Sequence, residues 1–154
     1  MVDQKESIPP ILRPDNVVAV SLRAIAERFD LEWASDESDT ELTGISMNTA
    51  DLRRGDLFVA MPGLKTHGAN FIQKAKDAGA VAVVTDSEGA KLAQGMGLPT
   101  LLLEHPRAHL GELAAFVYGN LPGTMPKLFA TTGTNGKTST SYLLEAMLRQ
   151  LGEV

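Results

Sequence analysis

The sequence predicts an α/β fold: a small three-layer amino-terminal domain with a mostly parallel sheet, followed by the beginning of a second domain. Short apolar runs without alternation, such as residues 80–85, are typical of strands that a parallel sheet buries on both faces. Between these runs lie segments whose apolar residues repeat at helical spacing, which indicates helices between the strands. A cluster of glycine and proline residues at 121–126 then predicts a domain boundary, so we expect domains over 1–124 and 125–154.

Composition and charge exclude several classes of protein. The chain has 154 residues, of which 44% are hydrophobic and 21% charged, as in an ordinary globular domain. Its formal net charge of -5 disfavours nucleic acid and anionic membrane surfaces as partners. No apolar run is long enough to cross a bilayer, and the first residues do not form a secretory signal, so we expect a cytoplasmic location without membrane insertion. Because the chain has no cysteine, disulfides, thiolate nucleophiles and thiolate zinc sites are excluded.

The first half of the amino-terminal domain predicts a helix and two strands. Ser21 is a suitable N-cap, and the apolar residues after it repeat at helical spacing as far as Phe29. Apolar runs at 42–47 and 57–61 predict strands, and the polar residues 48–51 predict the turn after the first of them.

Helices and strands alternate through the second half. We expect a helix over 70–78 ended by Gly79, a strand over 80–85, a helix over 87–94 capped by Ser87, a strand over 100–103, and a helix that begins at Pro106. This order is typical of parallel strands that are joined by helices.

The residues after the boundary predict a strand over 127–132, a glycine-containing loop, and a helix with an apolar stripe from Leu143 to Leu151. This order is typical of the first strand, phosphate-binding loop and helix of a P-loop ATPase domain. A single strand and helix cannot bury their apolar faces alone. We therefore expect the chain to be the amino-terminal fragment of a longer protein.

The loop contains the pair Lys137 and Thr138 at the predicted start of the helix. In phosphate-binding loops the backbone N–H groups and the lysine hold the phosphates, and the neighbouring hydroxyl ligates the accompanying Mg²⁺. The full pattern has glycine six positions before the lysine, where this chain has Thr131, so the match is to a shorter variant. We predict nucleotide binding here; the alternative is a tight turn without a ligand.

The stretch TGTNGKTST at 132–140 resembles the ATP-binding loop of the Mur ligases, the ATP-dependent amide-forming enzymes of peptidoglycan assembly. On its own it is equally similar to the loops of folylpolyglutamate synthetase and cyanophycin synthetase. The upstream stretch GDLFVAMPG at 55–63, with His67-Gly68, Phe71-Ile72 and AGAVA at 78–82, resembles the amino-terminal domain of the MurE branch of the family. Thr134 is also more similar to MurE than to MurF, in which serine is more common.

The resemblance implies part of an ATP-dependent acid–amino-acid ligase of peptidoglycan precursor synthesis, which serves cell-wall biogenesis, cell shape and cell division. The implied substrate is UDP-N-acetylmuramoyl-L-alanyl-D-glutamate, which is activated as an acyl phosphate and joined to a diamino acid, meso-diaminopimelate or L-lysine. ATP and Mg²⁺ are the implied cofactors. The isolated fragment is expected to have no ligase activity. A MurF-type ligase and a stand-alone, non-catalytic nucleotide-sugar-binding module are the alternatives.

The resemblance also implies the binding residues. Those for the nucleotide sugar follow two predicted strands, where open α/β sheets bind ligands: Met47, Thr49, Leu64, Lys65 and Thr66. Those for ATP are Gly133, Thr134, Asn135, Gly136, Lys137, Thr138 and Ser139. Within this loop, Thr138 would hold Mg²⁺ and Lys137 would be catalytic, by stabilising charge on the transferred phosphoryl group. The family commonly has aspartate, serine and arginine where this chain has Asn48, Thr49 and Ala50, so one cation is missing.

The three histidines, His67, His105 and His109, do not share a metal-ligand spacing. We interpret them as surface or capping residues. Arg53 and Arg54 are interpreted as turn residues, with contact to a pyrophosphate as the alternative.

Overall fold

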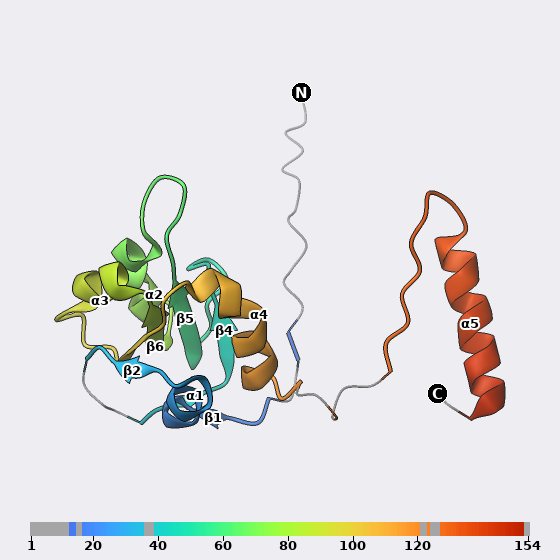
Figure 1. The fold of residues 1–154 in the computed structure, drawn as a ribbon, viewed down its shortest axis with the longest axis horizontal. Helices are drawn as coiled ribbons and strands as arrows, with labels where there is room; N and C mark the ends of the chain where they lie inside the picture. Colours follow the sequence, from blue (N-terminus) through green and yellow to red (C-terminus); the bar gives the residue numbers. More distant parts are fainter. Residues whose placement is uncertain (1–12, 15–16, 36–38, 121–122, 124–126, 153–154) are drawn as a thin grey trace. The chain divides into compact units, whose positions relative to one another are not determined.

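The computed structural model describes residues 13–14, 17–35, 39–120, 123 and 127–152. The chain divides into two compact units, Met1–Thr124 and Met125–Val154 (Figure 1). Within 121–126, where the sequence predicts the domain boundary, only Gly123 belongs to the described residues. No helix among the described residues is both long enough and apolar enough to cross a bilayer.

A five-stranded sheet forms the centre of the first unit, in the order β2-β7-β6-β5-β4. Its strands are β2 (Glu32–Trp33), β4 (Gly44–Ser46), β5 (Asp56–Ala60), β6 (Ala80–Thr85) and β7 (Thr100–Leu102). Strands β4 to β7 are parallel, and β2 pairs antiparallel with the outer edge of β7. The predicted α/β class with a mostly parallel sheet is thereby confirmed. The short strand β2 was not predicted. Its two residues show no strand pattern in the sequence, and they form a strand by pairing with β7.

The predicted single strand over 42–47 is wrong. Strand β3 (Glu41–Leu42) pairs antiparallel with β1 (Val20–Ser21) in a separate two-stranded sheet, whereas β4 belongs to the central sheet. The chain changes partner at Thr43, whose backbone N–H donates to the carbonyl of Gly55 at 2.9 Å. An apolar run shows where strands form but not which partner each part of it takes.

The helices of the first unit agree with the predictions, with small shifts. They are α1 (Leu22–Phe29), the 3-10 turn η1 (Gly68–Phe71) that leads into α2 (Ile72–Asp77), α3 (Ser87–Ala93) and α4 (Pro106–Val117). The Ser21 hydroxyl caps α1 by accepting from the N–H of Ala24 at 3.1 Å, as predicted. The predicted cap of α3 is wrong by one residue, since the carboxylate of Asp86, not Ser87, accepts from the N–H of Gly89 at 2.8 Å.

Two separate apolar cores lie on the two faces of the sheet. Along β5, Leu57 and Val59 belong to the core shared with α1 and α4, whereas Phe58 and Ala60 belong to the core shared with η1, α2 and α3. Successive side chains of a strand point to opposite faces, so the run of apolar residues from Leu57 to Ala60 packs against helices on both sides. The three-layer arrangement is therefore confirmed for this unit (Figure 1).

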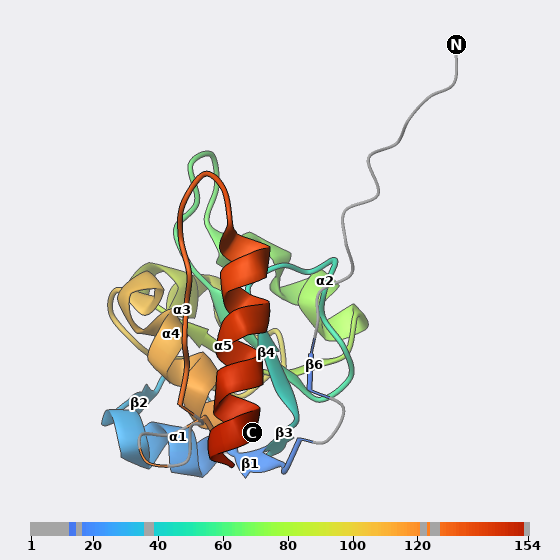
Figure 2. The ribbon, with the colours of Figure 1, turned by 90° about the vertical axis from the view of Figure 1, so that its right-hand side faces the viewer.

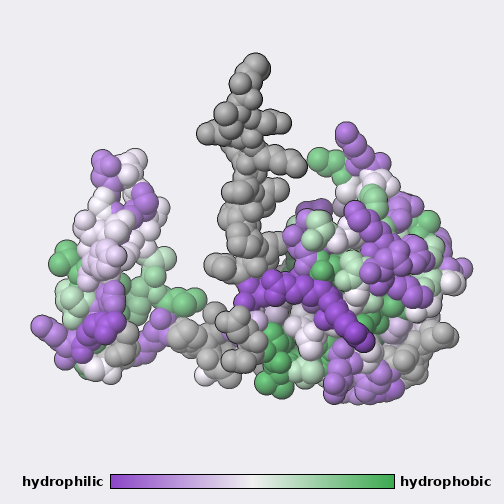
Figure 3. Space-filling model, turned by 180° about the vertical axis from the view of Figure 1, so that it is seen from behind, coloured by the Kyte–Doolittle hydropathy of each residue, from purple (hydrophilic) through white to green (hydrophobic). Residues whose placement is uncertain are grey.

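The second unit consists of an extended segment, a loop and helix α5 (Lys137–Leu151), shown in red in Figure 2. The strand predicted over 127–132 is wrong, because these residues form no strand. The described residues of this unit provide no neighbouring strand to take its hydrogen bonds. Helix α5 buries none of its side chains, and its predicted apolar stripe is exposed at Leu143, Met147 and Leu151. Figure 3 shows apolar surface, in green, on this unit.

Candidate functional site

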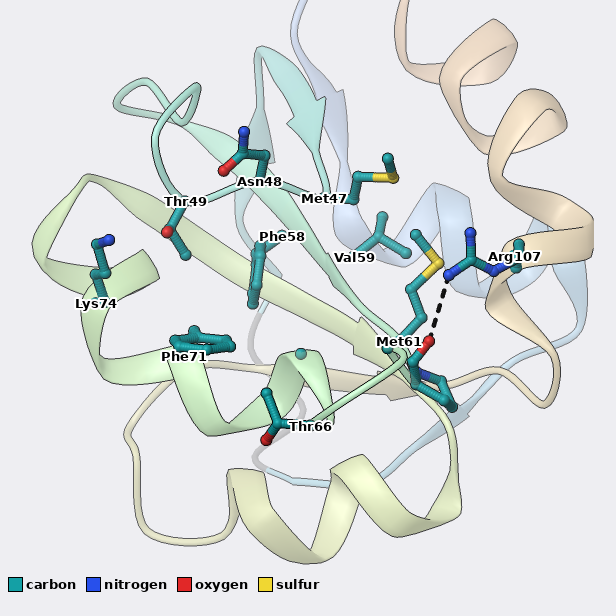
Figure 4. Close-up of a pocket in the computed structure, with 13 residues that line it drawn as sticks. Met47, Asn48, Thr49, Phe58, Val59, Met61, Thr66, Phe71, Lys74 and Arg107 are labelled. Atoms are coloured by element: carbon teal, nitrogen blue, oxygen red, sulfur yellow. Dashed lines mark hydrogen bonds between the residues drawn. The ribbon is translucent and has the colours of Figure 1, made fainter.

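A cavity of about 570 Å³ lies at the carboxyl edge of the central sheet (Figure 4). Its walls include residues 47–49, which follow β4, and residues 61–63, which follow β5. Parallel strands end at the same edge of a sheet, so the two segments meet although they are distant in sequence. This is where open α/β sheets bind their ligands.

Three of the five residues predicted to bind the nucleotide sugar line this cavity. Met47, Thr49 and Thr66 are among its lining residues, whereas Leu64 and Lys65 are not. Leu64 and Lys65 are exposed at the tip of the loop between β5 and η1. The structure therefore groups the first three residues, and a role for Leu64 and Lys65 stays a prediction.

Local hydrogen bonds shape the segment that follows β4. The side-chain oxygen of Asn48 accepts from the N–H of Ala50 at 3.1 Å, and its amide nitrogen donates to the carboxylate of Asp51 at 2.8 Å. Asn48 thus uses its side chain to hold the turn. Thr49 forms no side-chain hydrogen bond with another described residue, so its hydroxyl is available to a ligand.

The loop between β5 and η1 closes on itself. The N–H of Gly63 donates to the carbonyl of Thr66 at 3.1 Å, and the N–H of Gly68 donates to the carbonyl of Met61 at 2.9 Å. A Cβ atom at Gly68 would lie 2.9 Å from the backbone nitrogen of Met61, so the loop can close this tightly only with glycine there. The loop therefore presents Thr66 to the cavity on a backbone held by its own hydrogen bonds.

His67 ties this loop to the start of α3. Its Nδ1 accepts from the N–H of Ala69 at 3.0 Å, so the proton is on Nε2, which lies 3.0 Å from the carboxylate of Asp86 and donates to it. The same carboxylate oxygen caps α3 through Gly89, and both His67 and Asp86 are buried. The predicted capping role of a histidine is confirmed at His67, which caps η1.

Replacing His67 with phenylalanine is expected to lower the free energy of unfolding by about 1–3 kcal/mol, because Asp86 would lose a buried hydrogen-bond donor. Urea unfolding of the chain, followed by circular dichroism, measures the effect. His109→Phe is the matched control. His109 is half-exposed on α4, and its Nδ1 lies 3.6 Å from the carboxylate of Glu112 in a surface pair. Equal stability of the two variants would contradict the linking role of His67.

Sequence reasoning missed two cationic residues that line the cavity, Lys74 on α2 and Arg107 at the start of α4. Arg107 donates from Nη2 to the carbonyl of Pro62 at 3.3 Å. Two signals could have identified them. Arg107 lies in the first turn of a helix that follows a parallel strand, and such helix starts lie at the carboxyl edge of the sheet. Lys74 stands three residues after Phe71, which is the spacing of neighbours on one helical face.

The second unit holds the predicted phosphate-binding loop. Gly136 is the N-cap of α5 with φ 78°, and no side chain caps this helix start. The first N–H groups of the helix are therefore open to an anion. The Nζ of Lys137 donates to the carbonyl of Gly133 at 2.7 Å, so the lysine folds back over the loop. Thr131, Lys137 and Thr138 line a hollow of about 460 Å³ within this unit.

The donors present fit the phosphates of a nucleotide. Backbone N–H groups and the ammonium of Lys137 suit phosphate oxygens, and the hydroxyl of Thr138 suits the Mg²⁺ that accompanies them. The predicted loop residues Thr134, Asn135 and Ser139 are exposed beside them. The hydroxyl of Ser141 does not have its proton free for a ligand, since it donates to the carbonyl of Lys137 at 3.0 Å.

Comparison with known proteins relates the chain to ligases. Curated relatives include UDP-N-acetylmuramoyl-L-alanyl-D-glutamate–2,6-diaminopimelate ligases from Streptomyces avermitilis and Streptomyces coelicolor, at 45% and 43% identity over 92% of this chain. UDP-N-acetylmuramyl-tripeptide synthetase from Leifsonia xyli is 44% identical over 95% of this chain. The chain spans only 27–28% of the length of these relatives.

A solved structure of MurF from Acinetobacter baumannii has a similar fold, with a TM-score of 0.61 and 22% identity over 88% of this chain and 28% of that chain. This likeness concerns the fold alone. Residues 41–118, just over half of the chain, match the Mur ligase family, catalytic domain. The match covers strands β4 to β7 and the residues that line the cavity at their carboxyl edge, and it confirms the resemblance seen in the sequence. The chain belongs to the Mur ligase family.

Proposed function

We propose that the chain contributes the nucleotide-sugar pocket and the phosphate-binding loop of a MurE-type ligase. That enzyme would use ATP to join a diamino acid to UDP-N-acetylmuramoyl-L-alanyl-D-glutamate in peptidoglycan precursor synthesis. The observation that carries the proposal is the 45% identity over 92% of the chain with a relative named for this reaction. The names of the Streptomyces relatives favour 2,6-diaminopimelate over L-lysine as the diamino acid.

Each unit would have its own ligand. In the first unit, Met47, Thr49 and Thr66 line a cavity with the position and size of a small-molecule site, which supports binding of the nucleotide sugar there. In the second unit, Lys137 and Thr138 would hold the phosphates of ATP and the accompanying Mg²⁺. ATP would supply the phosphoryl group that activates the substrate carboxylate as an acyl phosphate, and Lys137 would offset the negative charge that develops during the transfer.

The proposal is tested by titrating the 154-residue chain calorimetrically with UDP-N-acetylmuramoyl-L-alanyl-D-glutamate and, separately, with Mg-ATP. We expect saturable binding of the nucleotide sugar and weaker binding of ATP, because the loop of the second unit is exposed on most sides. Thr49→Val should weaken binding of the nucleotide sugar about two- to tenfold, the usual effect of one lost neutral hydrogen bond.

Thr43→Val is the matched control for this titration. Thr43 is exposed and lies outside the cavity, and its hydroxyl contacts the carbonyl of Arg54 at 3.5 Å. The affinity of the Thr43→Val variant for the nucleotide sugar should equal that of the unaltered chain. If the unaltered chain bound no nucleotide sugar at millimolar concentration, the proposed role of the first unit would be wrong.

A further inference from the structure

The cavity of the first unit is positively charged within a chain of negative net charge. Its lining residues include Lys74 and Arg107 but no aspartate or glutamate among the residues that the structure describes. The chain as a whole has a formal charge of -5. Arg107 also borders a second hollow with Asp86 and Glu104, but the described lining of this cavity carries two cations and no acid. Such a lining gives a concave site a positive potential, which attracts an anionic ligand.

Both cations have hydrogen-bond donors to spare. The Nζ of Lys74 forms no hydrogen bond or ion pair with another described residue, and an ammonium has three donors. Arg107 uses one N–H for the carbonyl of Pro62, at 3.3 Å, and a guanidinium has five. The contact to Pro62 holds Arg107 at the cavity and leaves the rest of its donors for a ligand.

The two cations lie on opposite sides of the cavity (Figure 4). Lys74 lies on the side of Thr49, and Arg107 lies on the side of Met61, with the rings of Phe58 and Phe71 between them. Phe71 is 44% exposed and offers the cavity an aromatic surface, whereas Phe58 is buried in the core beneath it. Such a surface suits the face of a flat ring.

We propose that Lys74 and Arg107 supply the positive potential by which this cavity attracts a nucleoside diphosphate ligand. The inference rests on the proposed function and adds two cationic residues that attract the ligand by its charge. Lys65, at the exposed tip of the loop between β5 and η1, is not part of this pair.

The test compares a charged and a neutral probe. UDP and uridine share the base and ribose, and only UDP carries the diphosphate. We expect Lys74→Gln and Arg107→Gln each to weaken UDP binding about tenfold and to leave uridine binding within about twofold of the unaltered chain. The dependence of UDP affinity on salt concentration should also become shallower in both variants. Arg107→Lys keeps the charge and should bind UDP more tightly than Arg107→Gln.

Lys91→Gln is the matched control. Lys91 is exposed on α3 and does not line the cavity, so this variant removes the same charge without touching the site. If Lys74→Gln and Arg107→Gln bound UDP as tightly as Lys91→Gln, the inference would be wrong while the proposed function stood. If the two variants lost affinity for uridine and for UDP equally, Lys74 and Arg107 would act on the shape of the cavity, and the inference would also be wrong. If the unaltered chain bound neither UDP nor the nucleotide sugar, the proposed function itself would fail.

Discussion

Lys137→Ala is expected to lower kcat about 10²–10³-fold in an active ligase that contains this chain, because the variant removes a preorganised cation from the transferred phosphoryl group. The lysine begins α5, and its Nζ lies 2.7 Å from the carbonyl of Gly133, across the loop that would hold the phosphates. A suitable enzyme is a chimera in which this chain replaces the matching segment of the Streptomyces avermitilis relative. Formation of ADP in the presence of both other substrates measures kcat.

Arg149→Ala in the same chimera is the control. Arg149 also belongs to α5, but it lies near the end of the helix, where it pairs with Glu145 on the exposed surface at 2.8 Å. An exposed pair of this kind contributes less than about 1 kcal/mol, so its loss should leave kcat within about a few-fold of the parent chimera. A Lys137→Ala chimera that kept the kcat of the Arg149→Ala chimera would contradict the role of Lys137 in phosphoryl transfer.

Arg13→Ala is expected to lower the free energy of unfolding of the first unit by about 3–5 kcal/mol, since it leaves a buried carboxylate without its cation. Two distances of 2.7 and 2.8 Å join Nη1 of Arg13 to the two carboxylate oxygens of Asp56. Nη2 of Arg13 donates to the carbonyl of Asp51 at 2.7 Å. The side chains of Arg13 and Asp56 are only 8% and 1% exposed, so the pair is shielded from solvent.

Chemical denaturation of the chain, followed by the fluorescence of Trp33 in β2, measures this loss. Lys91→Ala is the control, because Lys91 is exposed on α3, and it should change the free energy of unfolding by less than about 0.5 kcal/mol. The double variant Arg13→Ala, Asp56→Asn should be more stable than Arg13→Ala alone, since the isolated buried charge is then removed. If Arg13→Ala were as stable as the control, the pair would not hold the segment before β1 to β5.

The helices of the first unit could be predicted because their signals are local. Ser21 and the apolar residues after it define α1, and Pro106 defines the first turn of α4. The error at α3 is also local. Asp86 and Ser87 are adjacent capping residues, and Asp86 is the one whose backbone is extended, with φ -80° and ψ -179°, as an N-cap requires.

Strand pairing could not be predicted in the same way. The apolar run at 127–132 has the composition of a buried strand, but a strand needs a neighbour for its N–H and C=O groups, and the described residues of the second unit supply none. Residues 42–47 divide between two sheets for a related reason, since each part pairs with a different segment. Pairing depends on parts of the chain that are distant in sequence.

The sequence alone determined the family and the α/β class, and it predicted a phosphate-binding loop, because short motifs and apolar periodicity are local properties of the chain. It also placed Met47, Thr49 and Thr66 after strands whose ends could be expected to meet. Only the tertiary structure decided that Lys74 and Arg107 share a cavity with them. The register of parallel strands and the packing of α2 and α4 on opposite faces bring these side chains to one edge, and no local pattern encodes that meeting.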